Sequence, residues 1–138
     1  MLDTSKTAPS VDAWLRQAKA DPSAAECGMY LTHNGVVRAT PKAEARGVET
    51  DGVEPGKKVG GMIFGYDAAK VKAAIEDAHA MPGIKYVRVW LADGQLAVGD
   101  DIMFVLIGGD IRPNVVDALQ ALVEIIKNEC VTEIECEA

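Results

Sequence analysis

The chain has 138 residues, 49% of them hydrophobic and 25% charged, a composition typical of one folded globular domain over 1–138. Its formal net charge of −7 argues against general nucleic-acid binding, which needs a basic face. No stretch reaches the ~18 consecutive apolar residues of a membrane-spanning helix, so we expect no membrane contact.

The first quarter of the chain predicts a helix and then a strand. Residues 1–10 are polar and lack the apolar core of a signal peptide, so we expect a cytoplasmic protein with reduced cysteines. Ser10 is a good N-cap for a helix over 11–20, which the following Asp-Pro pair ends. Residues 27–38 alternate loosely and predict a strand with a possible bulge at Gly35.

Residues 39–58 differ in composition from the rest of the chain. Glycine, proline and charged residues dominate this segment, and almost none of its residues is large and apolar. It cannot bury enough surface to offset the entropy of ordering, so we expect a mobile loop. Loops of this length often carry function, although a solvent-exposed loop without a function is the simpler interpretation.

A strand and a capped helix are expected next. Residues 59–66 predict the strand, and Asp67 is a suitable N-cap for a helix that extends to Ala80. Helical spacing predicts an inward face made of small and branched apolar residues. These are Ala68, Val71, Ala74, Ile75 and Ala78.

Two further strands follow. Residues 84–91 alternate and predict the first, and Asp93-Gly94 has the composition of a hairpin turn. Residues 101–108 form a nearly continuous apolar run, as expected of a central strand covered on both faces.

The C-terminal part predicts a long helix and an edge strand. The helix is expected to begin near Pro113, whose missing N–H costs nothing in a first turn, and to end at Asn128. Residues 131–136 alternate and suit an edge strand. The order αββαββαβ predicts an α+β fold in which helices pack on a mixed or antiparallel sheet. The helix is expected to bury Val116, Leu119, Leu122, Val123 and Ile126.

The strongest functional signal is an arginine at the start of this helix. Arg112 follows a buried strand and a glycine pair. A helix start presents free backbone N–H groups and a partial positive charge, so with the guanidinium it predicts a site for a small anion. A cation at this end is unfavourable against the helix dipole unless an anion binds, which favours function over a solvated surface arginine.

Several short motifs between residue 25 and the C-terminus occur in a fixed order. They are segment 28–38, which ends in Val-Val-Arg, then Gly94-Gln95-Leu96, Val98-Gly99-Asp100, the strand to Gly108, Arg112 and Lys127. In this order and spacing they resemble the large, catalytic subunit of molybdopterin synthase. The resemblance implies an α/β hammerhead fold, a homodimer, and a ubiquitin-like sulfur-carrier partner with a C-terminal Gly-Gly. It also implies sulfur transfer from the carrier's thiocarboxylate to cyclic pyranopterin monophosphate, giving the dithiolene of molybdopterin.

The resemblance implies roles by position. Lys127 would be the catalytic lysine, and Arg38 and Arg112 would bind the phosphorylated pterin substrate. Ile111 stands where the family has a histidine, and Ile134 where it has a second active-site lysine. We expect no metal and no cofactor. Further contacts from the loop could come from Arg46, Lys57 and Lys58.

Helix geometry adds a constraint on these roles. Arg112 and Lys127 are separated by about 22 Å along one predicted helix, so they cannot both touch one small substrate within a subunit. We therefore expect sites shared between the chains of the homodimer. The alternative is a non-catalytic anion- or pterin-binding or regulatory homologue of the same fold. His33, in the middle of a predicted strand, is expected to be a packed or surface histidine rather than a general base.

Overall fold

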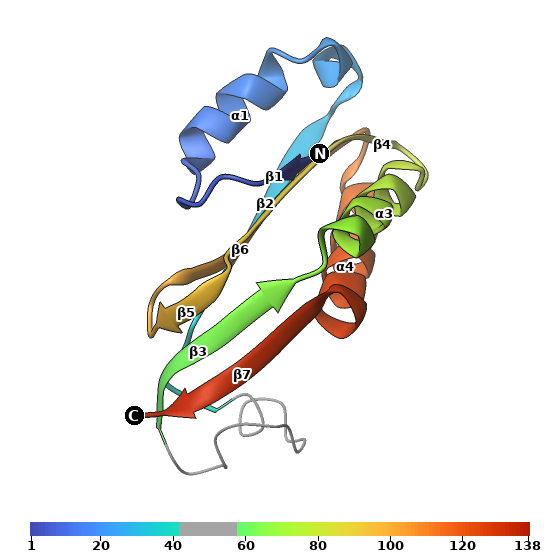
Figure 1. Cartoon of the computed structure of the whole chain (residues 1–138). Helices are drawn as coiled ribbons and strands as arrows, with labels where there is room; N and C mark the ends of the chain where they lie inside the picture. The colour runs from blue at the N-terminus through green and yellow to red at the C-terminus, as the bar shows by residue number, and fades with distance from the viewer. Residues whose placement is uncertain (42–57) are drawn as a thin grey trace.

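The computed structural model describes residues 1–41 and 58–138. Residues 42–57, which form most of the loop predicted over 39–58, lie outside the described residues together with Arg46 and Lys57. The described part contains two sheets, and Figure 1 shows how the helices are arranged around them.

The two sheets use strands from all parts of the chain. The four-stranded sheet has the order β1-β4-β6-β2 and the three-stranded sheet the order β5-β3-β7. Neighbouring strands are antiparallel except β1 and β4, which are parallel. The predicted α+β class with a mixed sheet is thus confirmed. The strands are β1 (Leu2–Asp3), β2 (Met29–Val36), β3 (Val59–Tyr66), β4 (Ile84–Leu91), β5 (Gly94–Ala97), β6 (Asp101–Gly109) and β7 (Val131–Glu137).

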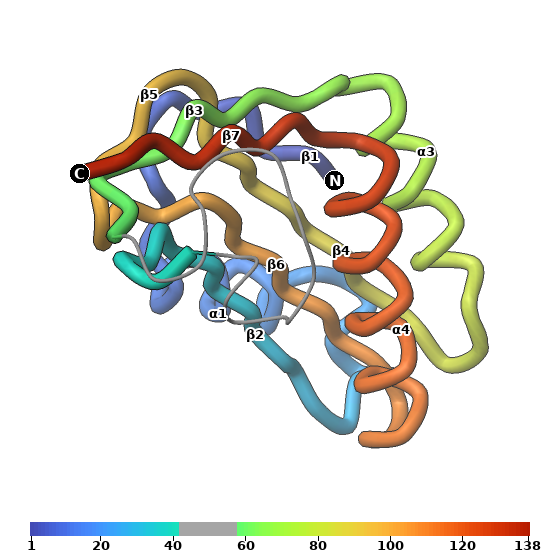
Figure 2. The backbone as a smooth tube through the Cα atoms, turned by 90° about the horizontal axis from the view of Figure 1, so that it is seen from below, coloured from blue at the N-terminus to red at the C-terminus, as the bar shows by residue number. Residues whose placement is uncertain are grey.

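Helices cover both faces of the four-stranded sheet. The helix α1 (Val11–Lys19) lies on one face, and α3 (Ala68–His79) and α4 (Arg112–Ile125) lie on the other (Figure 1). A 3-10 turn, η1 (Pro22–Glu26), follows α1, and a π-helical turn, η2 (Ile126–Cys130), follows α4. Figure 2 shows the chain leaving this turn into β7, which returns alongside β3.

The predicted N-caps are both present. The Ser10 side chain accepts a hydrogen bond from the backbone N–H of Ala13, and Asp67 accepts from those of Ala69 and Lys70. Each cap satisfies donors that the first helical turn leaves without a partner. Of the inward residues predicted for α3, Ala68, the first residue of the helix, is exposed. The other four are buried as predicted: Val71, Ala74, Ile75 and Ala78.

The buried face of α4 differs from the prediction. The fully buried residues are Val115, Ala118, Leu122 and Ile126, while Val116, Leu119 and Val123 are only half-buried. The helix packs against β6, β2 and α3, and the small Ala118 is among its fully buried residues. The prediction assigned the larger apolar side chains to the buried face, but two of them, Leu119 and Val123, line a surface groove.

The predicted central strand is confirmed. β6 lies between β4 and β2, and Ile102 to Gly109 are buried. The register of β2 against β6 shifts between Gly35 and Val36, where the bulge was expected.

The predicted hairpin at Asp93-Gly94 is wrong. β4 pairs with β1 and β6, whereas β5, which begins at Gly94, pairs with β3 in the other sheet. Gly94 has a φ of +103°, a conformation that glycine adopts without strain, and it carries the chain from one sheet to the other. Neither β5 nor β1 was predicted from the sequence, because strands of four and two residues are too short to show an alternating apolar pattern.

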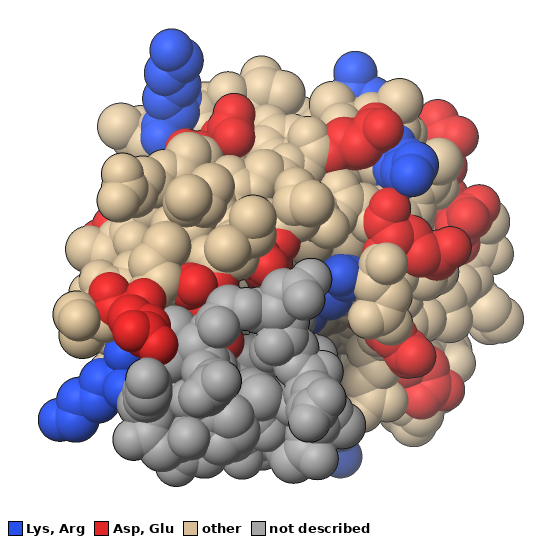
Figure 3. All heavy atoms as spheres, turned by 60° about the horizontal axis from the view of Figure 1, so that its bottom comes forward, with Lys and Arg blue, Asp and Glu red and all other residues tan. Residues whose placement is uncertain are grey.

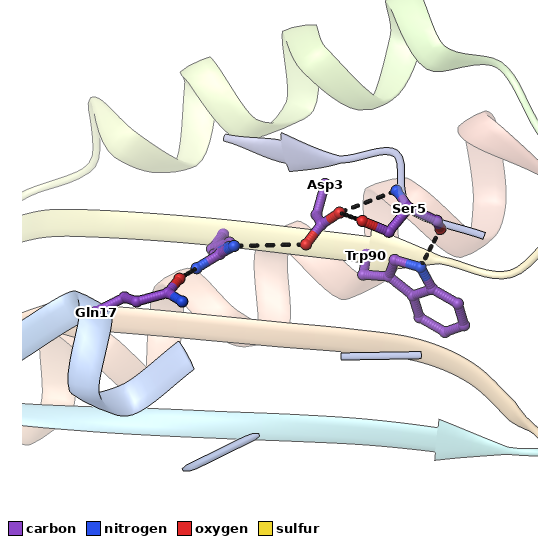
Figure 4. Close-up of polar contacts among 5 residues, drawn as sticks. Asp3, Ser5, Gln17 and Trp90 are labelled. Atoms are coloured by element: carbon purple, nitrogen blue, oxygen red, sulfur yellow. Dashed lines mark hydrogen bonds and ion pairs between the residues drawn. The ribbon is translucent and has the colours of Figure 1, made fainter. Parts of the chain in front are cut away.

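A partly buried arginine, Arg88, joins the N-terminal segment to the four-stranded sheet, close to the contacts of Asp3, Ser5, Gln17 and Trp90 that Figure 4 shows. The Arg88 guanidinium lies 4.5 Å from the centre of the Trp14 ring and forms an ion pair with Asp3 at 3.4 Å. It also donates a hydrogen bond to the side chain of Gln17. Hydrogen bonds from Ser5 and the ion pair with Arg88 lower the pKa of Asp3, while burial opposes them. These contacts tie α1 and β1 to β4.

Candidate functional site

Two of the predicted site residues meet where β2 ends and α4 passes into β7. Arg38 and Lys127 line one small cavity of about 40 Å³. The same cavity is lined by two carboxylates of β7, Glu133 and Glu135. Two cations and two carboxylates therefore surround one space. Apolar residues complete the lining: Val36, Met62 and Ile102.

The Gly-Asp motif supports the segment that carries Arg38. Gly99 has a φ of +92°, and its N–H donates to the carbonyl of Val37 at 2.7 Å. The N–H of Val37 in turn donates to the carbonyl of Asp100 at 3.0 Å. Asp100 closes its own turn by accepting from the N–H of Ala97. This turn fixes the backbone immediately before the arginine, and Arg38 Nε then donates to the carbonyl of Thr40.

Lys127 lies in the π-helical turn and is half-buried. Besides the small cavity, it lines a larger groove of about 480 Å³ that follows α4. π-Helical turns frequently occur at functional sites. Among the described residues, the lysine is thus the one common to both linings. The other residues of the groove are His33, Leu119, Gln120, Val123, Glu124 and Asn128.

His33 faces this groove from β2. Its Nε2 atom is buried and has no hydrogen-bond partner among the described residues. Burial lowers the pKa of His33 below its usual 6.5, and the positive charge of Lys127 lowers it further. The ring is therefore neutral at neutral pH. The half-buried ring fits the predicted packed or surface histidine, but alternation along the strand could not show that a lysine and a groove lie opposite.

Arg112 lies at the other end of α4 and lines neither the cavity nor the groove. Arg112 is exposed, and so is its neighbour Ile111, which is 57% exposed. Asp110 accepts hydrogen bonds from the N–H of Ile111 and from the side chain of Asn114. Those two bonds lower the pKa of Asp110. Asp110 thus lies immediately before the helix start, whose N-cap Ile111 provides no side-chain cap hydrogen bond.

Ile134, the residue expected at the position of a second active-site lysine, lies on the other face of β7. Ile134 is 48% exposed, as is its cross-strand partner Ile63. Since side chains alternate along a strand, Glu133 and Glu135 point to the cavity and Ile134 away from it. The alternation along β7 was predicted from the sequence, but alternation alone does not show which face of the strand meets the cavity. Lys58, the one described member of the predicted loop contacts, is exposed and lines neither space.

The charges on this side of the molecule are mixed. In Figure 3 the described lysines and arginines appear as separate groups among scattered carboxylates rather than as one basic patch. Within residues 1–41 and 58–138, no three His, Cys, Asp or Glu side chains are placed to hold a metal ion. No helix in those same ranges is long and apolar enough to cross a membrane.

Comparison with known proteins identifies relatives of this architecture. The sequence model of a family described as MoaE protein matches residues 5–129. Molybdopterin synthase from Staphylococcus aureus superposes with a TM-score of 0.72 at 14% identity, over 98% of this chain and 90% of that one. The molybdopterin biosynthesis MoaE protein from Burkholderia ambifaria gives 0.69 at 13% identity, over 99% and 90%.

A third solved structure contains two kinds of chain. It is a complex of subunits 1 and 2 of the molybdopterin-converting factor from Helicobacter pylori. It matches with a TM-score of 0.65 and 16% identity over 97% of this chain and 83% of that chain. No curated protein sequence shows a significant match.

Proposed function

Because this chain belongs to the MoaE protein family, we propose that it is the large subunit of a cytoplasmic molybdopterin synthase. Its reaction is sulfur transfer from a thiocarboxylated small carrier protein to cyclic pyranopterin monophosphate, forming the dithiolene of molybdopterin. The observation that carries this proposal is the meeting of Arg38 and Lys127 at one cavity. The Helicobacter pylori complex of two subunits supports a small-subunit partner.

The two cations have different tasks in this reaction. Arg38 binds the phosphate, because a guanidinium offers planar, bidentate recognition and stays charged. When sulfur leaves the carrier's acyl carbon, an oxygen from water must replace it, and a negatively charged adduct forms on the way. Lys127 stabilises this charge from a preorganised position. Glu133 and Glu135 line the same cavity and reduce its net charge.

The function is tested by reconstitution. Purified protein is mixed with a thiocarboxylated carrier that ends in Gly-Gly and with the pyranopterin precursor, and the dithiolene product is measured. We expect product in amounts that follow the carrier consumed. A carrier that retains its sulfur throughout would contradict the enzymatic proposal.

A second candidate function is non-catalytic binding of a pterin or anion. The observation that favours it is the presence of two carboxylates in the cavity that Arg38 and Lys127 line. These carboxylates weaken the binding of a phosphate and the stabilisation of a negative adduct. Calorimetric binding of the pyranopterin without any product in the reconstituted mixture would favour this candidate over the enzyme.

The proposed enzyme is a homodimer with sites shared between its chains. Arg112 is exposed and remote from Lys127 within one chain, and Ile111 beside it is an exposed apolar side chain. Both features are expected of a segment that enters the cavity of a second copy. The partner subunit's Arg112 would then add the cation that the cavity needs to balance its carboxylates.

Mixing two inactive variants tests the sharing. In a mixed dimer of Arg112→Ala and Lys127→Ala chains, one of the two sites keeps both native residues. Random reassortment should therefore restore about a quarter of the wild-type rate. The measurement is the rate of dithiolene formation after the variants are unfolded and refolded together. A mixture no more active than the separate variants would refute shared sites, and each variant refolded alone serves as control.

A further inference from the structure

We propose that His33 is a second catalytic residue of this site, where Nε2 takes the proton from the water that releases the carrier protein. This role rests on the proposed function. The step is hydrolysis of the acyl–sulfur bond that links the carrier to the pterin. The water oxygen bonds to the acyl carbon, and one water proton moves to Nε2. The electron pair of the C–S bond stays with the sulfur, which keeps its place on the pterin. The imidazolium then returns its proton to that sulfur.

The position of the ring supports this role. His33 comes from the face of β2 that packs towards α4, and it lines the groove together with Lys127. Gly35 follows on the same face of the strand, and a β-carbon there would lie only 3.8 Å from Nε2. Gly35 therefore lies directly beside the nitrogen, and a β-carbon there would only reach ordinary van der Waals contact with it.

The unused hydrogen-bonding capacity of Nε2 is the second observation. Buried polar atoms in proteins are nearly always hydrogen-bonded, and those that are not require an explanation. In a neutral ring with its proton on Nδ1, Nε2 is an acceptor, and a water molecule in the groove is a suitable donor. The described residues provide no competing donor at hydrogen-bond distance.

The charged groups around the ring favour the neutral form. Lys127 faces it from η2, and Glu124 lines the same groove from α4. The neighbouring strand β6 contributes only buried apolar residues over 102–107. Burial, followed by the charge of Lys127, lowers the pKa of His33, so the ring can accept a proton at neutral pH. Lys127, which lines the same groove, stabilises the charged adduct in this proposal.

The test uses the reconstituted reaction with His33→Gln and His33→Phe. Loss of a general base typically lowers the rate about 100- to 10,000-fold. Because sulfur transfer to the pterin precedes the water step, we expect the carrier–pterin conjugate to accumulate, and mass spectrometry detects it. The wild-type rate should fall as the pH drops through the lowered pKa of His33, and both variants should lose this acidic limb. His79→Gln is the matched control, since His79 is exposed on α3.

The outcomes separate the two proposals. If wild-type protein forms product and both variants keep its rate and its acidic limb, the role of His33 is overturned and the proposed function stands. If both variants are slow but no conjugate accumulates, His33 does not act in the water step. If wild-type protein forms no product at all, the proposed function fails, and this role fails with it.

Discussion

Replacing Lys127 by alanine should lower the rate of sulfur transfer by about 100- to 1,000-fold, the usual cost of removing one preorganised group that stabilises a developing negative charge. Lys127 lines both the cavity with Arg38 and the groove with His33, so no other described residue reaches both spaces. The measurement is the single-turnover rate of dithiolene formation with saturating thiocarboxylated carrier. Binding of the pyranopterin should weaken far less than the rate.

Two control variants make this result specific. Lys72→Ala removes an exposed lysine on α3 and should leave the rate unchanged. Lys127→Arg keeps the charge but changes its shape, so it should recover part of the activity. A Lys127→Ala protein that retains its fold and turns over within about threefold of the wild-type rate would show that the lysine takes no part in the chemistry. Such a result would leave the enzymatic function in place and assign stabilisation of the adduct to another group.

The second large effect concerns stability. Phe64→Ala should lower the free energy of unfolding by about 3–5 kcal/mol, because it deletes a core aromatic side chain and leaves a cavity. Phe64 is 1% exposed and comes from β3, the central strand of the three-stranded sheet. Its loss removes apolar contact between that sheet and the rest of the core. Urea denaturation followed by circular dichroism measures the change.

The neighbouring residue supplies the matched control. Ile63 lies on the same strand but is 48% exposed, so Ile63→Ala should change stability by less than about 1 kcal/mol. Equal losses from the two substitutions would mean that the outer face of this sheet is covered in solution. Equal losses would also mean that Ile63 belongs to the core, in contrast to its exposed position in the structure.

The elements that local patterns could predict were predicted well. The strands β3 and β4 have the predicted bounds, because each combines a clear apolar pattern with turn residues at its ends. Ser10 and Asp67 marked the starts of α1 and α3 through hydrogen bonds that lie within three residues along the chain. Such information is local, and the sequence therefore contains it.

The predictions that failed depended on distant partners. The turn at Asp93-Gly94 has hairpin composition, yet the strand after it joins β3 in the other sheet. The buried face of α4 was set by packing against β6 and α3 rather than by the size of its own side chains. Turn composition and helical period do not specify which neighbour an element will pack against.

The candidate site divides in the same way. Local patterns predict the α+β class, most of the elements and the chemical groups available, including Arg38 and Lys127, because hydrophobic period, capping and residue chemistry are properties of short segments. The folded chain is needed to show that these two cations share a cavity with Glu133 and Glu135, that His33 faces the lysine, and that Arg112 lies at the far end of its helix. Contacts between remote segments arise from the packing of complete sheets and helices, and no short stretch of sequence encodes that packing.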